Sequence, residues 1–153
     1  MKELMLMIGL VAAGVASAQD ASSVRLDGVA DQVIECRLDE QASAKIARDQ
    51  HRRALSTESF KLRIEKGELT GKLGGRKIPD FNRHTDQVFE SARKLEDGRI
   101  VVRVAEEGWD HVYHTISIDP KASRAQVSGD ALYDCGSPFR FVGQMTCTVR
   151  QLN

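Results

Sequence analysis

Residues Phe60–Leu73 have the sequence FKLRIEKGELTGKL, and their pattern is the clearest guide to the fold. Apolar side chains alternate with polar ones on both sides of a central Lys-Gly pair at 66–67, which is the pattern of a β-hairpin with two half-buried strands. A two-residue turn at this pair places Ile64 opposite Leu69 and Phe60 opposite Leu73. One face of both strands is then apolar, so the alternation fixes the register.

Two further hairpins follow along the chain. Phe89–Leu95 and the strand from Ile100 flank Asp97-Gly98, a pair suited to a tight turn, which predicts that Leu95 pairs with Ile100. In the next hairpin Asp119-Pro120 ends a strand whose inner face carries Val112, His114, Ile116 and Ile118, and Ala125, Val127 and Gly129 return. The last predicted strands cover residues 131–135 and 144–151, where β-branched residues are frequent.

Residues 39–55 depart from this pattern. The segment has no proline or glycine, Asp39 can cap a helix, and apolar residues recur at helical spacing, so one short helix is predicted there. Its apolar stripe is narrow, which places the helix against the outside or the end of the sheet.

About eight strands in hairpin order, with one helix and no βαβ rhythm, indicate an all-β, mainly antiparallel barrel or sandwich. A barrel is favoured because a strand at 33–38 and a strand at 146–151 could pair and remove the exposed edges.

The first eighteen residues have the features of a cleavable signal peptide. Lys2 precedes an apolar run from Leu4 to Val15, and small residues at Ala16 and Ala18 suit a signal peptidase. The run is shorter than the roughly 20 residues of a membrane-spanning helix, and no second apolar run follows. The sequence predicts a protein exported to the periplasm or medium, without a membrane anchor, that begins near Gln19.

Removal of residues 1–18 from the 153-residue chain leaves 135 residues, which is enough for the single domain predicted over 19–153. The removed segment carries one lysine and one glutamate, so the mature chain keeps 21 basic and 21 acidic side chains. A neutral chain argues against a nucleic-acid partner, which calls for a basic excess.

Three cysteines in an exported chain allow one internal disulfide and leave one thiol. Cys135 and Cys147 flank a turn-like Gly-Ser-Pro stretch and could face each other across a hairpin, so this pair is the first choice. Cys36 with Cys147 is the alternative, because both have apolar neighbours at alternate positions and could join the first and last strands.

No catalytic, cofactor-binding or metal site is predicted. Trp109-Asp110-His111 with His114 is the densest local cluster, but residues three apart on a strand point to opposite faces, so the two histidines cannot chelate together. His84, between Asp80 and Asp86, is interpreted as solvated, with nothing nearby to act as a nucleophile.

Two other patterns are also excluded as sites. Glu106 and Glu107 diverge if they lie on a strand, so they do not form a pair of catalytic acids. Gly71, Gly74 and Gly75 follow a hairpin, without the helix that a phosphate-binding loop requires, and are interpreted as turn glycines.

Several aromatic residues are candidates for contacts with a partner. Trp109 is predicted in a turn, Phe81 in a loop, and Phe139-Arg140-Phe141 in another loop, and aromatic residues and arginine dominate binding hot spots. The alternative, which is preferred, is that these rings fill the end of the barrel.

In general architecture, an exported, disulfide-linked β scaffold with long loops resembles periplasmic lysozyme inhibitors and lipocalin-like barrels of the bacterial envelope. The resemblance covers architecture only, since Trp109 is the only tryptophan and the lipocalin Gly-x-Trp motif near the first strand is missing.

Two hypotheses follow. The first is a protein-binding or inhibitor-like module that docks through the loops at 74–82 and 136–143 and has a filled interior. The second is a carrier whose cavity, for a small apolar ligand, is lined by inward residues of the hairpins: Ile64, Ile100, Val102, Ile116 and Val127.

Overall fold

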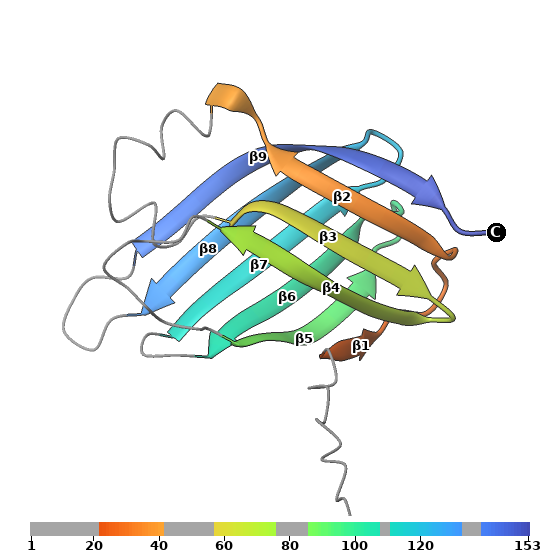
Figure 1. Cartoon of the computed structure of the whole chain (residues 1–153), viewed down its shortest axis with the longest axis horizontal. Coiled ribbons are helices and arrows are strands. Elements are labelled where there is room, and N and C mark those ends of the chain that lie inside the picture. The colour runs from red at the N-terminus through yellow and green to blue at the C-terminus, as the bar shows by residue number, and fades with distance from the viewer. Residues whose placement is uncertain (1–21, 42–56, 76–85, 108–110, 133–138) are drawn as a thin grey trace, which may run out of the picture.

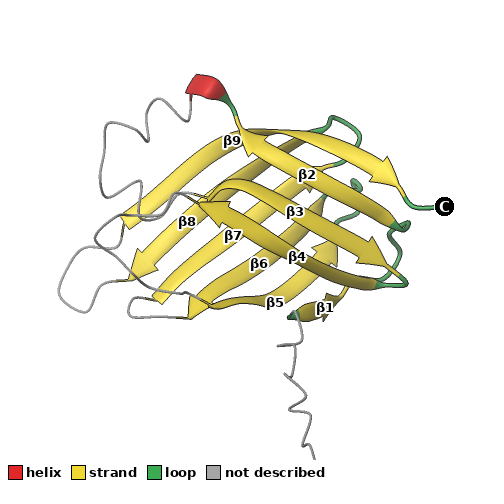
Figure 2. Cartoon of the chain, in the orientation of Figure 1, coloured by secondary structure: helices red, strands yellow, loops and turns green. Residues whose placement is uncertain are grey.

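The computed structural model describes residues 22–41, 57–75, 86–107, 111–132 and 139–153, and these form a nearly closed, barrel-shaped antiparallel sheet (Figures 1 and 2). The predicted all-β barrel is therefore confirmed. Its nine strands are β1 (Ser23–Arg25), β2 (Gln32–Leu38), β3 (Thr57–Glu65), β4 (Glu68–Gly75), β5 (Asp86–Lys94), β6 (Ile100–Glu107), β7 (His111–Asp119), β8 (Arg124–Leu132) and β9 (Phe139–Gln151).

The order of strands in the sheet is β1-β4-β3-β2-β9-β8-β7-β6-β5. Pairing of β2 with β9, predicted from their edge positions, joins the early and late strands, with Cys36 opposite Cys147. The predicted β3–β4 register is also observed, because Ile64 lies opposite Leu69 and Phe60 opposite Leu73. Most of the predicted helix, at 42–56, lies outside the described residues.

Alternation along the strands directs apolar side chains inward, where they form one core. The inward layer contains aliphatic, aromatic and sulfur-containing residues. Its largest fully buried apolar members are Leu26, Ile34, Leu62, Ile64, Leu69, Ile100, Ile116, Ile118 and Met145.

The disulfide joins Cys36 and Cys147, whose Cα atoms are 4.1 Å apart. The first choice, Cys135 with Cys147, is therefore wrong, and the alternative is confirmed. The physical reason is that β2 and β9 are neighbours in register, so both side chains point inward from directly paired positions. Cys135 lies outside the described residues.

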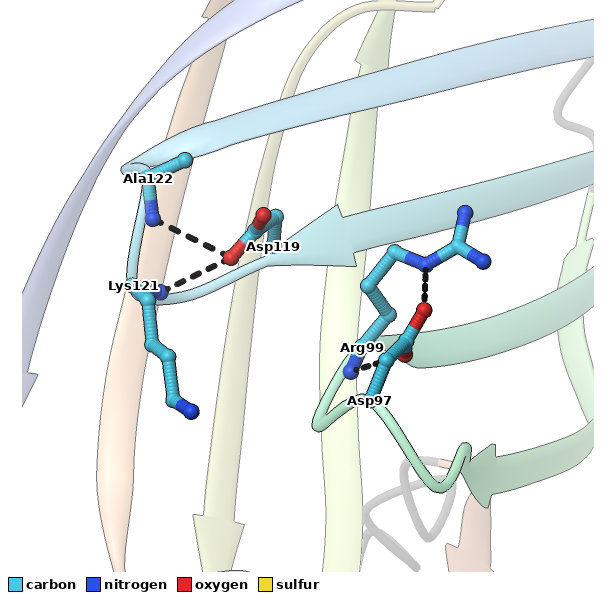
Figure 3. Close-up of polar contacts among 5 residues, drawn as sticks. All are labelled: Asp97, Arg99, Asp119, Lys121 and Ala122. Carbon is cyan, nitrogen blue, oxygen red and sulfur yellow. Dashed lines mark hydrogen bonds and ion pairs between the residues drawn. The ribbon is translucent and has the colours of Figure 1, made fainter.

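Tight turns connect strands at one end of the barrel, here called the turn end. In Figure 3, Asp119 accepts hydrogen bonds from the backbone N–H groups of Lys121 (3.0 Å) and Ala122 (3.1 Å). Asp97 accepts bonds from the backbone N–H (3.0 Å) and the guanidinium Nε–H (2.7 Å) of Arg99, and these bonds lower the pKa of the Asp97 carboxyl. Such side-chain caps replace the backbone partners that a turn leaves unpaired.

The β5–β6 turn differs from the prediction by one position. Ile100 pairs with Lys94 rather than with Leu95, and Leu95 bonds instead to the carbonyl of Arg99. The loop therefore has three residues, and Gly98 occupies its positive-φ position with φ of 89°. A bulge next to Phe89 restores the inward direction of that ring.

The last hairpin also differs from the prediction. Ala131 and Leu132 end β8 instead of beginning a separate strand, and β9 already begins at Phe139. The β8–β9 ladder extends to the pair Ala131 and Phe139, because inward Phe141 continues the alternation of the later part of β9. Gly74 and Gly75, predicted in a loop, lie at the end of β4.

The ends of the sheet meet at a seam between β4 and β5, which no backbone ladder closes. β1 pairs only with Glu68–Thr70 of β4. Further along, the side-chain amide of Gln87 accepts a bond from the N–H of Leu73 (2.8 Å) and donates one to its carbonyl (3.0 Å). The hydroxyl of Ser22 accepts a bond from the N–H of Phe89 at 2.9 Å. Side chains therefore take the place of strand pairing here.

Candidate functional site

The end opposite the turns, here called the distal end, is where β3, β5, β7 and β9 begin and β2, β4, β6 and β8 end (Figure 1). Inward polar side chains gather near this end. His114 follows the predicted inward alternation of β7 and is only 2 % exposed. Its cross-strand neighbours are Val104 on β6 and Gly129 on β8.

Thr57, His114 and Glu106 make up what we call the polar cluster. The Thr57 hydroxyl lies 3.2 Å from His114 Nδ1, and Glu106 Oε1 lies 3.5 Å from His114 Nε2. Thr57 is buried, and the Glu106 side chain keeps 20 % of its surface exposed. Nε2 is buried and makes no hydrogen bond that meets ordinary geometric limits.

A hydroxyl, an imidazole and a carboxylate in series are the components of a nucleophilic catalytic triad. In such a site the hydroxyl has to reach the substrate. Thr57 is 3 % exposed and its hydroxyl points into the barrel toward His114, so no substrate can approach it. We therefore assign no catalytic role to the polar cluster in this conformation.

One member of this cluster was predicted from the sequence to lie on an inner face. His114 was predicted on the inner face, but its partners come from other strands: Glu106 is the diagonal neighbour on β6, and Thr57 is the first residue of β3. The side chains of His111 and Glu107 lie outside the described set, as do residues 80–84 and 108–110. Among the described residues, no three potential metal-binding side chains gather.

The proposed contact residues of the last hairpin are separated by the structure. Phe139, Arg140 and Phe141 lie on β9 rather than in a loop, because they pair with β8. Phe141 is 5 % exposed and fills the interior, as the preferred interpretation of the aromatic residues predicted. Arg140 points outward and forms an ion pair with Asp130 at 2.7 Å. Phe81, Trp109 and the side chain of Phe139 lie outside the described part.

An outward surface beside Arg140 was missed by the sequence reasoning. Among the residues that the structure describes, Val142 is the large apolar residue that lies exposed, with 50 % of its surface accessible. Across the sheet, the Arg103 guanidinium lies 4.7 Å from the ring centroid of Tyr113, whose backbone pairs with Asp130. We call Arg103, Tyr113, Arg140 and Val142 the outer patch. Correct placement of β9 would have revealed its part of the patch, Arg140 and Val142, since residues that alternate with Phe141 face outward.

The interior residues predicted to line a cavity are closely packed. Ile64, Ile100, Val102, Ile116 and Val127 are at most 1 % exposed. A cavity large enough for a ligand leaves accessible surface on the side chains that line it, and these five have almost none.

Inward glycines do not open space either. A Cβ atom at Gly71 would lie 2.5 Å from Leu62 Cδ2, and one at Gly143 would lie 2.6 Å from Leu38 Cδ2 and 2.7 Å from Phe141 Cζ. Neighbouring side chains therefore occupy the volume that the missing side chains leave.

A shallow depression on the outside of the β3–β4 hairpin is the other hollow of interest. Charged residues line it, including Arg63 and Glu65, which pair at 2.8 Å. The Arg63 guanidinium lowers the pKa of the Glu65 carboxyl through a hydrogen bond and its charge. The depression is open, and Arg63 and Glu65 in its lining already pair with each other, so it does not define a ligand.

Comparison of the chain with protein-family models, with curated proteins and with solved structures gave no match. Among the described residues, no helix is long and apolar enough to cross a membrane.

Proposed function

We propose that this chain is an exported, non-enzymatic binding protein whose ligand is another protein, as in an inhibitor-like module of the bacterial envelope. The observation that carries the proposal is the filled interior. Ile64, Ile116 and Val127 retain no accessible surface, which argues against the alternative of a carrier that holds an apolar molecule inside the barrel.

Export is supported by the signal-like segment at 1–18 and by the Cys36–Cys147 disulfide, since disulfides persist in oxidising compartments.

The outer patch is the surface that we assign to the partner. Arginine and tyrosine are enriched in binding hot spots, and an exposed apolar residue gains most from being covered. Arg140 is already neutralised by Asp130, and Arg103 by Glu90 at 2.7 Å, so covering the patch buries no unpaired charge.

The first test is capture of the partner protein by the immobilised chain. The chain from Gln19, with its disulfide intact, is immobilised. It is then exposed to envelope extract or culture medium of its own cells, and mass spectrometry identifies the bound material. We expect one stoichiometric protein that V142E no longer captures. The matched control is T148E, which places the same charge on an exposed outward position of the same strand.

Native mass spectra of the protein purified from its own compartment distinguish the alternatives. A discrete small adduct that denaturation releases would support the carrier and contradict our proposal. A bare barrel that captures no protein would contradict it as well.

A further inference from the structure

The polar cluster leaves one buried nitrogen, Nε2 of His114, without a hydrogen bond. His114 is held at Nδ1 by the Thr57 hydroxyl, while Nε2 points at the Glu106 carboxylate across 3.5 Å. Buried imidazole nitrogens usually have a partner, and an orphan calls for an explanation such as an ion. Nothing in the proposed binding function uses this group.

We propose that His114 Nε2 and Glu106 Oε1 are two ligands of a divalent transition-metal ion such as Zn²⁺. Two ligands about 2.1 Å from a tetrahedral zinc ion lie about 3.4 Å apart, close to the observed separation. An imidazole nitrogen with a carboxylate oxygen favours zinc or copper over magnesium or calcium.

The Thr57 hydroxyl is placed as an outer-shell group. A metal-bound histidine usually donates its other ring N–H to an oxygen atom, which fixes the tautomer and the ring orientation. Thr57 Oγ1 is in position to accept a hydrogen bond from His114 Nδ1–H, and this tautomer leaves the Nε2 lone pair free for the metal.

Access and affinity follow from the position of the site. Glu106 lies in the last part of β6, at the distal end, and its side chain is partly exposed, so an ion enters past this carboxylate. Two protein ligands leave the remaining positions to water. The site is therefore weaker than the structural zinc sites, which have four protein ligands.

The test is calorimetric titration of the disulfide-intact chain with ZnCl₂, and with MgCl₂ in parallel, in a buffer that does not bind metals. We expect one zinc site and no magnesium binding. E106Q, which preserves size, should weaken zinc binding at least tenfold, and T57V should weaken it by about tenfold through the outer shell. E90Q, which removes an outward carboxylate, should leave it unchanged.

Nitrogen NMR of the imidazole rings adds a readout at the site, because zinc should shift Nε2 of His114 and not its Nδ1. Circular dichroism verifies that each variant is folded. Absence of binding up to millimolar zinc, or zinc binding that E106Q leaves intact, would overturn the proposal. The test is independent of the protein partner, so either proposal can fail alone.

Discussion

Gly71 lies where a side chain on β4 would collide with β3. A Cβ atom there would meet the carbonyl oxygen of Lys61 at 2.6 Å as well as Leu62, and a backbone carbonyl cannot rotate away. At Gly74, on the same strand, the nearest atom is the hydroxyl of Ser59, also at 2.6 Å, which can rotate. The two glycines therefore differ in what a side chain would displace.

We expect G71A to destabilise the fold by roughly 1–3 kcal/mol, because overpacking forces backbone shifts, and G74A to cost clearly less. Urea unfolding of both variants measures the difference. Equal losses would mean that β4 can move away from β3 as a whole.

Asp39 follows β2 and links it to β9 and to the start of β8. Its carboxylate accepts hydrogen bonds from Thr146 Oγ1 (2.8 Å) and from the Arg124 guanidinium (2.7 Å). The Thr146 bond first, and then the Arg124 bond and charge, lower the pKa of Asp39 from its ordinary value of 3.8. A lowered pKa means that the folded state favours the charged carboxylate.

The stability from Asp39 is therefore present above the unfolded pKa and is lost as the pH falls through the folded pKa. We expect D39N to lower the free energy of unfolding by about 0.2–1 kcal/mol at pH 7, since the pair is partly exposed. The loss should shrink as the pH falls below 3.8, which urea titrations across the acid range can measure. A deficit that is constant with pH would contradict the assignment.

For individual strands, the alternation of apolar and polar residues was sufficient to predict the register wherever one face of the strand points inward. It fixed the pairing of Phe60 with Leu73 and of Ile64 with Leu69, because a shift of one residue would turn apolar side chains outward. It failed at the loop before Ile100, since a three-residue loop with Gly98 competes with a two-residue turn.

The candidate site was only partly predictable for a related reason. The position of His114 follows from its own strand, but Thr57 and Glu106 come close only through cross-strand register and a bulge near the start of β3. The choice of disulfide failed similarly, because proximity in the chain favoured Cys135 while the sheet places β9 beside β2.

The disulfide joins two elements that are 111 residues apart in the chain. A cross-link over such a long loop restricts the unfolded chain, which is worth about 4–5 kcal/mol in the loop-entropy model. We expect the double variant C36A/C147A to lose roughly this amount in urea unfolding.

C135A is the control, and it should keep both the disulfide and the stability. Peptide mapping by mass spectrometry under non-reducing conditions verifies the bond. Retention of a disulfide in C36A, through Cys135, would contradict the arrangement described for β2 and β9.

At the scale of the whole molecule, the seam is the place where the barrel is held by side chains. Q87A removes both bonds to the backbone of Leu73, while the paired strands on either side remain. We expect faster hydrogen exchange of the Leu73 amide and little change at the amides of the β6–β7 ladder, because local opening needs less energy than unfolding.

The control for the seam is Q126A on the outer face of β8, which should leave the Leu73 amide protected. If Q87A instead raised exchange across all strands equally, the seam would be part of one cooperative unit and not a local opening.

Pairing of β2 with β9 also sets the order in which the molecule can assemble. β3 with β4, and β5 through β9, form hairpins between strands that follow each other in the chain, and such local contacts form early. The contact between β2 and β9 has to wait until the last strand has been synthesised. Until this contact forms, each of the two strands exposes one unpaired edge, which is a surface prone to aggregation. We therefore expect the slowest step of folding to be the closure of β2 onto β9, which the Cys36–Cys147 bond then makes permanent.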